Sequence, residues 1–221
     1  MVSCLISAYY AREFIHNRLL NLLGYERIVV CQKGSYEEKI ARKYNAEVII
    51  TTPDIPTIGK AWNLAYRAAT CDYVTTANTD DIIYRHGYEQ MARILDNNPD
   101  IGLVFGNVDV TTGGPPQPWK RIPDMSGRLA NPERILGSCF IGPMPLWRRN
   151  WCDIIGGFDE ELVSADWEYW MCMYSKGANF WYIDAALGCY NKRQDSLEHR
   201  NRNTIVKEKR ILREQYRMVT A

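Results

Sequence analysis

The first 110 residues alternate between two patterns of hydrophobic positions. Short apolar runs, typical of buried strands, are followed by segments in which apolar residues recur every three or four positions, as on one face of a helix. We therefore predict strands at 2–7, 27–31, 47–52, 73–77 and 101–110, and helices at 11–23, 35–44, 58–69 and 84–95. Ser35 followed by Glu38 predicts an N-cap for the second helix. This succession predicts an α/β fold with a mostly parallel sheet flanked by helices.

The pattern changes at residue 111. Segment 111–134 is rich in proline and glycine and shows neither periodicity, so we predict a long loop, and long loops within compact domains are usually functional. A mixed region follows, with a helix at 166–175 and a strand at 179–183. We predict one domain over 1–203, made of a half at 1–110 that binds the ligand and a mixed half at 111–203. A C-terminal helix is predicted over 204–221.

Composition narrows the class of protein. The 221 residues carry a formal net charge of +1, which argues against a nucleic-acid-binding protein. The seven cysteines show no metal-ligand spacing, no apolar run is long enough to span a membrane, and no signal-peptide pattern is present. We therefore expect a cytoplasmic protein in a reducing compartment. In the basic C-terminal helix, Glu208 and Glu214 favour packing on the domain, with dimerisation or peripheral contact with an anionic membrane as alternatives.

Polar side chains gather where three of the predicted strands end, at 7–10, 32–35 and 78–81. Ligands of parallel sheets bind outside the carboxyl ends of the strands, so we expect one crevice with a nucleotide lying across it. Asp80 and Asp81 repel each other unless a cation lies beside them. A divalent metal that carries a diphosphate is one interpretation. An Asx-rich turn that caps the next helix is the other.

Six segments, in this order, resemble the family 2 glycosyltransferases, which have the GT-A fold. They are Ser7-Ala8-Tyr9-Tyr10, Gln32-Lys33-Gly34-Ser35, the helix with Gly59 and Asn63, Asn78-Thr79-Asp80-Asp81, Gly156-Gly157-Phe158-Asp159-Glu160 and Ala165-Asp166-Trp167-Glu168-Tyr169-Trp170. The fourth corresponds to the family's Asp-x-Asp-type metal motif. The resemblance implies a metal-dependent, inverting glycosyltransferase that moves a sugar from a nucleotide-diphosphate donor, with a UDP-sugar preferred, to the hydroxyl of a glycan or glycolipid acceptor.

The resemblance also implies roles for individual residues. Asp80 would hold Mn²⁺ or Mg²⁺, and His199 could be a third metal ligand or a phosphate contact, although a solvated surface histidine is the more common case. Tyr9 would pack on the nucleoside, with an ordinary core tyrosine as the alternative. The residues expected to contact the donor are Ser7, Tyr9, Gln32, Gly59, Asn63, Asn78 and Asp81.

Asp166 is the expected general base, because a carboxylate on a different element from the metal site suits removal of the acceptor proton. Helix N-capping is the alternative role for Asp166. Glu168 is the second candidate for the base, whereas Asp159 or Glu160 would contact the acceptor or cap the same helix. The loop at 111–134, with Trp119, Lys120 and Arg121, lies where the resemblance puts acceptor recognition; an ordinary surface loop is the alternative.

Two departures from the family pattern leave other functions open. Asn78 stands where an aspartate commonly contacts ribose or metal, and Gln32 stands where an acidic residue commonly reads uracil. An amide can still face a pyrimidine, since it has a donor and an acceptor. A catalytically degenerate protein that binds a sugar or nucleotide is therefore an alternative. A sugar nucleotidyltransferase is less favoured, because residues 7–12 lack the expected glycine-rich loop.

Overall fold

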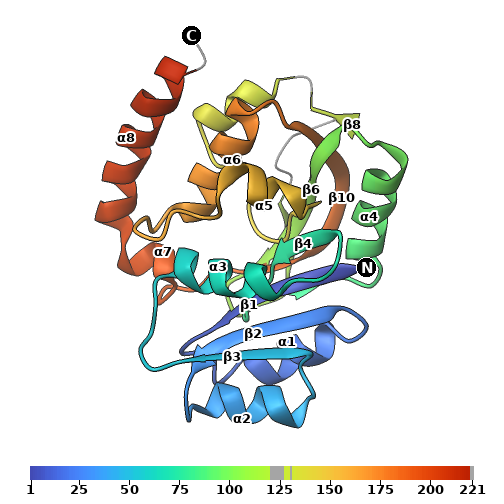
Figure 1. Ribbon diagram of the computed structural model, residues 1–221, viewed down its shortest axis with the longest axis vertical. Coiled ribbons are helices and arrows are strands. Elements are labelled where there is room, and N and C mark those ends of the chain that lie inside the picture. Colours follow the sequence, from blue (N-terminus) through green and yellow to red (C-terminus); the bar gives the residue numbers. More distant parts are fainter. Residues whose placement is uncertain (120–126, 130, 220–221) are drawn as a thin grey trace.

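The computed structural model describes residues 1–119, 127–129 and 131–219. Its described strands form one mixed sheet, in the order β3-β2-β1-β4-β9-β6-β10-β5, with β7 beside β6 and β8 beside β10. The strands are β1 (Val2–Ala8), β2 (Glu26–Gln32), β3 (Val48–Thr52), β4 (Tyr73–Thr76), β5 (Ile82–Ile83), β6 (Ile101–Thr111), β7 (Gln117–Trp119), β8 (Gly127–Arg128), β9 (Leu146–Arg148) and β10 (Asn179–Asn191). Figure 1 shows this sheet running through the molecule with helices against it.

Most of the helices lie between these strands in the chain, and α7 and α8 follow the last strand. They are α1 (Ile15–Asn21), α2 (Tyr36–Lys43), α3 (Ile58–Ala68), α4 (Gly87–Asn97), the 3-10 helix η1 (Pro132–Leu136), α5 (Asn150–Ile155), α6 (Ala165–Ser175), α7 (Leu197–Arg200) and α8 (Arg202–Val219). The prediction of an α/β fold with a mostly parallel sheet flanked by helices is confirmed.

The direction of the strands places several chain ends at one edge of the sheet. The pairs β1–β2, β2–β3, β1–β4 and β6–β10 are parallel, whereas β9 runs antiparallel between β4 and β6. The carboxyl ends of β1, β2, β4, β6 and β10 therefore face the same way. The chain adds β2 and β3 on one side of β1 and β4 on the other, which makes the β1–β4 boundary the switch point where ligands of such sheets bind.

Alternating side chains of the strands supply two hydrophobic cores. On β1, Leu5 belongs to the core with α3 and α6, whereas Cys4 and Ile6 belong to the core with α1, α2 and α4. This alternation follows from the period of two along a strand. Burial of both sheet faces explains why the strands appear in the sequence as continuous apolar runs.

Local capping fixes where the helices begin. Ser35 Oγ accepts a hydrogen bond from the N–H of Glu38 at 3.2 Å, and the Glu38 carboxylate accepts one from the N–H of Gly34 at 2.7 Å. The predicted N-cap at Ser35 is thereby confirmed. Thr57 caps α3 in the same way, accepting from the N–H of Lys60 at 3.3 Å. Each cap lies in the connection that follows a strand, Ser35 after β2 and Thr57 after β3, on the ligand-binding edge of the sheet.

Segment 111–134 contains more regular structure than the sequence pattern predicts. The short strand β7 pairs with β6, β8 pairs with β10, and η1 begins at Pro132. These elements are too short to show a hydrophobic period, and β7 contains a proline. Residues 120–126 and 130 lie outside the described part of the chain, so the expectation for Lys120 and Arg121 is not addressed.

The strand predicted at 179–183 is also longer than the sequence indicates. β10 continues to Asn191, and its pairing with β6 shifts register between Ile183 and Ala186 and again between Ala186 and Cys189. Such bulges interrupt the alternation on which a sequence prediction depends. The continuation matters for function, because it carries Asn191 and the residues that follow to the ligand-binding edge.

The C-terminal helix α8 packs against α6 and η1 (Figure 1). Among the α8 side chains that the structure describes, the hydrophobic ones of Ile205, Leu212 and Tyr216 are buried, and Leu212 and Tyr216 join the core that contains α6. Within the described residues, no helix combines the length and the apolar character needed to cross a membrane.

Candidate active site

A cleft of about 540 Å³ lies at the carboxyl edge of the sheet. It is lined by residues from segments far apart in the chain, which include the ends of β1, β4 and β10 and parts of α3, α6 and α8. Five of the predicted site residues line it: Ser7, Tyr9, Asn78, Asp80 and Asp166. Residues that the sequence analysis did not assign to a site also line it, including Thr57, Tyr190, Arg193, Ile205 and Lys209.

Ser7 and Tyr9 form the part of the cleft where β1 ends. Tyr9 is half-buried, and its hydroxyl shares a 2.8 Å hydrogen bond with Thr52 Oγ1 at the end of β3. The ring therefore lies across the ends of neighbouring strands with its edge fixed. Its core role and its place in the cleft are compatible, because one part of the ring packs on the protein while another lines the cavity.

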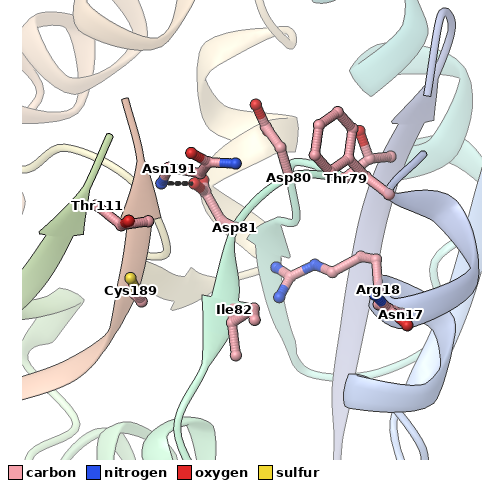
Figure 2. Close-up of a pocket in the computed structure, with 10 residues that line it drawn as sticks. Asn17, Arg18, Thr79, Asp80, Asp81, Ile82, Thr111, Cys189 and Asn191 are labelled. Carbon is pink, nitrogen blue, oxygen red and sulfur yellow. Dashed lines mark hydrogen bonds between the residues drawn. The ribbon is translucent and has the colours of Figure 1, made fainter. Parts of the chain in front are cut away.

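Asp80 and Asp81 follow β4 and have different surroundings. Asp81 is 1% exposed; its carboxylate accepts hydrogen bonds from the N–H of Asn191 at 3.1 Å and from Asn78 Nδ2 at 3.3 Å. Figure 2 shows Asp81 turned toward Asn191 on β10. Burial, together with the negative charge of Asp80, raises the pKa of Asp81 to about 7. Asp80 is the more open of the two, and burial also raises its pKa.

Two arginines supply positive charge beside this carboxylate pair. Arg193, after β10, places Nη1 3.4 Å from Asp80 Oδ2, donates to Asp195 and stacks 4.4 Å from the centre of the Phe14 ring. Arg18, on α1, is 1% exposed and reaches into a second cavity of about 170 Å³ that both aspartates line (Figure 2). The charge of each arginine opposes the rise in the pKa of Asp80. The positive charges of the two arginines thus partly offset the negative charges of Asp80 and Asp81.

The oxygen atoms that the protein offers here could hold a divalent cation only together with other ligands, such as substrate phosphates and water. Asp80 offers a hard carboxylate oxygen in the cleft, beside a second carboxylate whose repulsion a cation would relieve. Among the residues that the structure describes, no group of three His, Cys, Asp or Glu side chains is arranged to hold a metal ion. Mg²⁺ and similar ions commonly take few protein ligands together with substrate phosphates and water. Asp80 suits that kind of site.

Asp166 lies in the first turn of α6, on the cleft wall formed by Trp167 and Trp170. Its Oδ1 accepts a hydrogen bond from the N–H of Trp167 at 2.8 Å, so the carboxylate also serves the start of the helix. Burial raises the pKa of Asp166, and the charge of Glu198 raises it further. A half-buried carboxylate with a raised pKa, facing a cleft, is suited to accept a proton.

Glu168, the second candidate for the base, has a different environment. It is not among the residues that line the cleft, and its Oε1 accepts a hydrogen bond from the hydroxyl of Tyr216 on α8. Of the acidic residues before the helix, Asp159 accepts from the N–H of Glu161 at 2.8 Å and Glu160 accepts from Asn63 at 3.0 Å. These carboxylates hold the local structure together.

Gly59 and Asn63 connect α3 to the turn at Gly156-Gly157. Asn63 Nδ2 donates to the Phe158 carbonyl at 2.9 Å, and its Oδ1 accepts from the Phe158 N–H at 2.8 Å. Both glycines of the turn have φ of 98°, which glycine adopts at little cost. The Asn63 amide is already hydrogen-bonded to the main chain of Phe158, and neither Gly59 nor Asn63 lines the cleft. Both residues therefore hold the turn that precedes α6 and do not face a ligand in the cleft.

We expect Gly59→Ala to destabilise the protein. A Cβ at position 59 would lie 2.3 Å from the carbonyl oxygen of Asp159, which is backbone and cannot rotate away. The free energy of unfolding should fall by about 1 to 3 kcal/mol, as for overpacked cores. Urea denaturation measures it. Gly114→Ala is the control, because nothing lies within 4 Å of a Cβ there, and an equal loss in both variants would contradict the prediction.

Gln32 and His199 are not brought to the cleft. Gln32 Nε2 donates to the Pro53 carbonyl at 3.2 Å, outside the residues that line the cavity. His199, on the short helix α7, is exposed, and its ring nitrogen lies 3.3 Å from Ser196 Oγ. Among the described residues, His199 belongs to no group of three or more His, Cys, Asp or Glu side chains that could hold a metal ion.

The sequence analysis missed the cations of the site for identifiable reasons. Arg18 occupies a position on the buried face of α1, beside Ile15 and Leu19, so its place in the apolar helical period was the available signal. Arg193 follows a strand whose continuation beyond residue 183 was not predicted. Its signal was weak, because the bulges of β10 hide the strand end that precedes it.

Comparisons with known proteins identify the family and the fold of this chain. The sequence profile described as "Glycosyl transferase family 2" matches residues 3–156, more than half of the chain. No curated protein sequence matches significantly. Among solved structures, S. aureus TarS 1-349 in complex with UDP-GlcNAc superposes with a TM-score of 0.71 at 19% identity, covering 88% of this chain and 59% of that one.

A second relative by structure is the mannosyltransferase PcManGT from Pyrobaculum calidifontis, in complex with GDP-Man and Mn²⁺. It has a TM-score of 0.65 and 14% identity, with 86% of this chain and 56% of that one covered. The chain thus spans about 60% of the length of TarS 1-349. At these identities the superpositions establish a shared GT-A fold, and the profile match establishes the family. This chain belongs to glycosyl transferase family 2.

Proposed function

We propose that this protein is an inverting glycosyltransferase that moves a sugar from a nucleoside diphosphate sugar to an acceptor hydroxyl. One observation carries the proposal: a single cleft holds Asp80 at the end of β4 and Asp166 at the start of α6. The two carboxylates come from different elements, so one can serve the diphosphate while the other serves the acceptor. Family membership supports sugar transfer as the reaction.

In this mechanism Asp166 accepts the proton of the acceptor hydroxyl as the oxygen attacks the anomeric carbon. Its raised pKa favours proton transfer, and the indoles of Trp167 and Trp170 keep water from its surroundings. Attack from the side opposite the diphosphate inverts the anomeric centre. The acceptor is a glycan or glycolipid, for which Trp119, 48% exposed on the cleft wall, offers a ring that can stack on a sugar.

The donor side of the cleft would hold the nucleoside diphosphate. Tyr9 packs on the nucleoside, Ser7 and Asn78 offer hydrogen bonds, and Arg193 supplies a fixed positive charge near the phosphates. Asp80 would hold Mn²⁺ or Mg²⁺, which when bound supplies charge neutralisation of the departing diphosphate. A UDP-sugar is our preferred donor, as in the TarS complex with UDP-GlcNAc; the PcManGT complex with GDP-Man makes GDP the alternative to test.

A donor screen tests the proposal. UDP, GDP, CDP and dTDP are added with and without Mn²⁺, and the melting temperature is measured, because a ligand that binds only the folded state raises it. We expect one nucleotide to stabilise the protein in the presence of metal, and the matching sugar donor to release nucleoside diphosphate. No stabilisation and no release with any common donor would contradict the proposal.

A protein that binds a nucleotide sugar without turnover is the second candidate. Asn78 favours it, because an uncharged amide that already donates to Asp81 is a weaker metal ligand than an aspartate. The same screen separates the two functions. Stabilisation by a nucleotide without release of nucleoside diphosphate, in the presence of varied acceptors, would support the binding protein.

A further inference from the structure

Glu208 on the C-terminal helix makes an unusual contact with the start of α6. It is 8% exposed, and its two carboxylate oxygens accept hydrogen bonds from the N–H of Val163 and the N–H of Ser164, both at 2.9 Å. These two N–H groups lie immediately before Ala165, the first residue of α6. A side chain more than forty positions along the chain thus anchors the entry into this helix.

The residue at the N-cap position does not cap α6 with its own side chain. Ser164 occupies the N-cap position of α6, yet its side chain makes no capping hydrogen bond. The two N–H groups that Glu208 binds lie just outside the helix, next to the positive end of the helix dipole, which favours a nearby carboxylate. Glu208 provides that carboxylate from a different helix. Ser164 instead lines the cleft.

The anchored segment is the one that carries the base. Asp166 lies two residues after Ser164, and its carboxylate is held by the N–H of Trp167 in the same turn. The next residues of α8 contact this turn as well: the Lys209 ammonium lies 5.9 Å and the Arg213 guanidinium 5.5 Å from the centre of the Trp167 ring. The position of Asp166 in the cleft therefore depends on the contacts that α8 makes with the first turn of α6 and the residues before it.

We propose that Glu208 is a positioning residue for the glycosyl transfer reaction, which fixes the first turn of α6 and thereby the direction of the Asp166 carboxylate. This inference rests on the proposed role of Asp166 as the base. It makes α8 part of the catalytic unit, since Ile205 and Lys209 of the same helix line the cleft. The donor residues Ser7, Tyr9 and Asp80 stand on other elements and do not depend on this contact.

Glu208→Gln and Glu208→Ala test the inference. Glutamine keeps the size but offers an NH₂ group where one backbone N–H needs an acceptor, and alanine removes both acceptors. We expect kcat for transfer to fall by about 10-fold in the first and about 100-fold in the second, as for a misplaced catalytic group. KM for the donor should stay within about twofold, because the substitutions do not alter the residues proposed to bind the donor. Melting temperature confirms that each variant is folded at the assay temperature.

Two variants on the same helix serve as controls. Glu214→Gln removes an exposed carboxylate of α8 and should leave kcat unchanged. Tyr216→Phe removes the hydrogen bond from the Tyr216 hydroxyl to Glu168 on α6, which does not reach the residues just before Asp166, so its kcat should stay near that of the unaltered protein. An equal loss in Tyr216→Phe and the Glu208 variants would show general docking of α8 and overturn the inference.

The remaining outcomes separate this inference from the proposed function. Unchanged kcat in Glu208→Gln and Glu208→Ala, with Asp166→Asn inactive, would overturn the positioning role and leave the base assignment standing. Full activity in Asp166→Asn would overturn the base assignment itself. If Glu208→Ala does not fold, the kcat and donor KM of Glu208→Gln decide, because its side chain keeps the original volume.

Discussion

Asp166→Asn is expected to reduce glycosyl transfer by about 10²- to 10⁴-fold, the range for loss of a general base. The amide has nearly the shape of the carboxylate and can still accept the hydrogen bond from the Trp167 N–H at the start of α6. Folding should therefore be retained, while the group that takes the acceptor proton is lost. The measurement is kcat for transfer together with donor affinity, which we expect to remain unchanged because Asp166 serves the acceptor in the proposed mechanism.

The pH dependence of transfer gives the same residue a second signature. Burial raises the pKa of Asp166, and the basic form that accepts a proton exists only above that raised pKa. Activity should therefore fall as the pH is lowered through it, at a higher pH than an exposed aspartate would give. This fall at low pH, the acidic limb of the pH profile, should be absent from the residual activity of Asp166→Asn.

Glu168→Gln is the matched control for the base. Glu168 also has a pKa raised by burial, but its carboxylate accepts from Tyr216 and is not among the residues that line the cleft. Its replacement should leave the acidic limb in place. If Glu168→Gln instead loses transfer while Asp166→Asn keeps it, the base is Glu168 and our assignment fails.

The first half of the fold could be predicted because each of its elements is locally self-consistent. Strands buried on both faces are continuous apolar runs, and helices such as α2 carry their own caps at Ser35 and Glu38. The second half could not be predicted to the same extent. β10 passes through bulges near Ala186, and β9 is three residues long between two strands from elsewhere in the chain. These strands form because of the strands they pair with, and a local sequence pattern does not identify those partners.

The same distinction applies to the site. Ser7, Asn78 and Asp80 could be placed in one cleft because each follows a predicted parallel strand, and strand ends share an edge. Gly59 and Asn63 carry the family pattern but hold the turn before α6, a role that only the three-dimensional contacts distinguish from ligand binding. Glu208 could not be found from the sequence, since an acidic residue in a basic helix gives no sign of its distant partner.

The proposed metal site differs from the family pattern in the carboxylates that it offers to a cation. Asn78 stands where the family pattern commonly has an aspartate, and its amide donates a hydrogen bond to Asp81. Asp81 is nearly fully buried, with hydrogen bonds from Asn78 and from the main chain of Asn191. Of these side chains, Asp80 is the carboxylate that both lines the cleft and remains partly exposed. Metal binding should therefore depend on Asp80 more than it would in a site with two accessible carboxylates.

We accordingly expect Asp80→Asn to abolish the metal-dependent part of nucleotide binding and to reduce transfer by at least about 100-fold, the scale of several kcal/mol that a bound cation contributes to charge stabilisation. The measurement is the shift in melting temperature produced by nucleoside diphosphate with and without Mn²⁺, followed by transfer activity over a range of Mn²⁺ concentrations. Asparagine keeps an oxygen at the same position, so the loss would report the charge of Asp80 rather than its shape.

Asp195→Asn separates this effect from the loss of an arginine contact. Both Asp80 and Asp195 pair with Arg193, but Asp195 lies beyond the end of β10 and has no carboxylate neighbour in the chain comparable to Asp81. Asp195→Asn should retain the additional stabilisation that Mn²⁺ gives to the nucleotide complex. If Asp80→Asn also retains it, the cation is held by groups other than Asp80. Asp80 would then serve to orient Arg193, since its carboxylate lies 3.4 Å from the guanidinium.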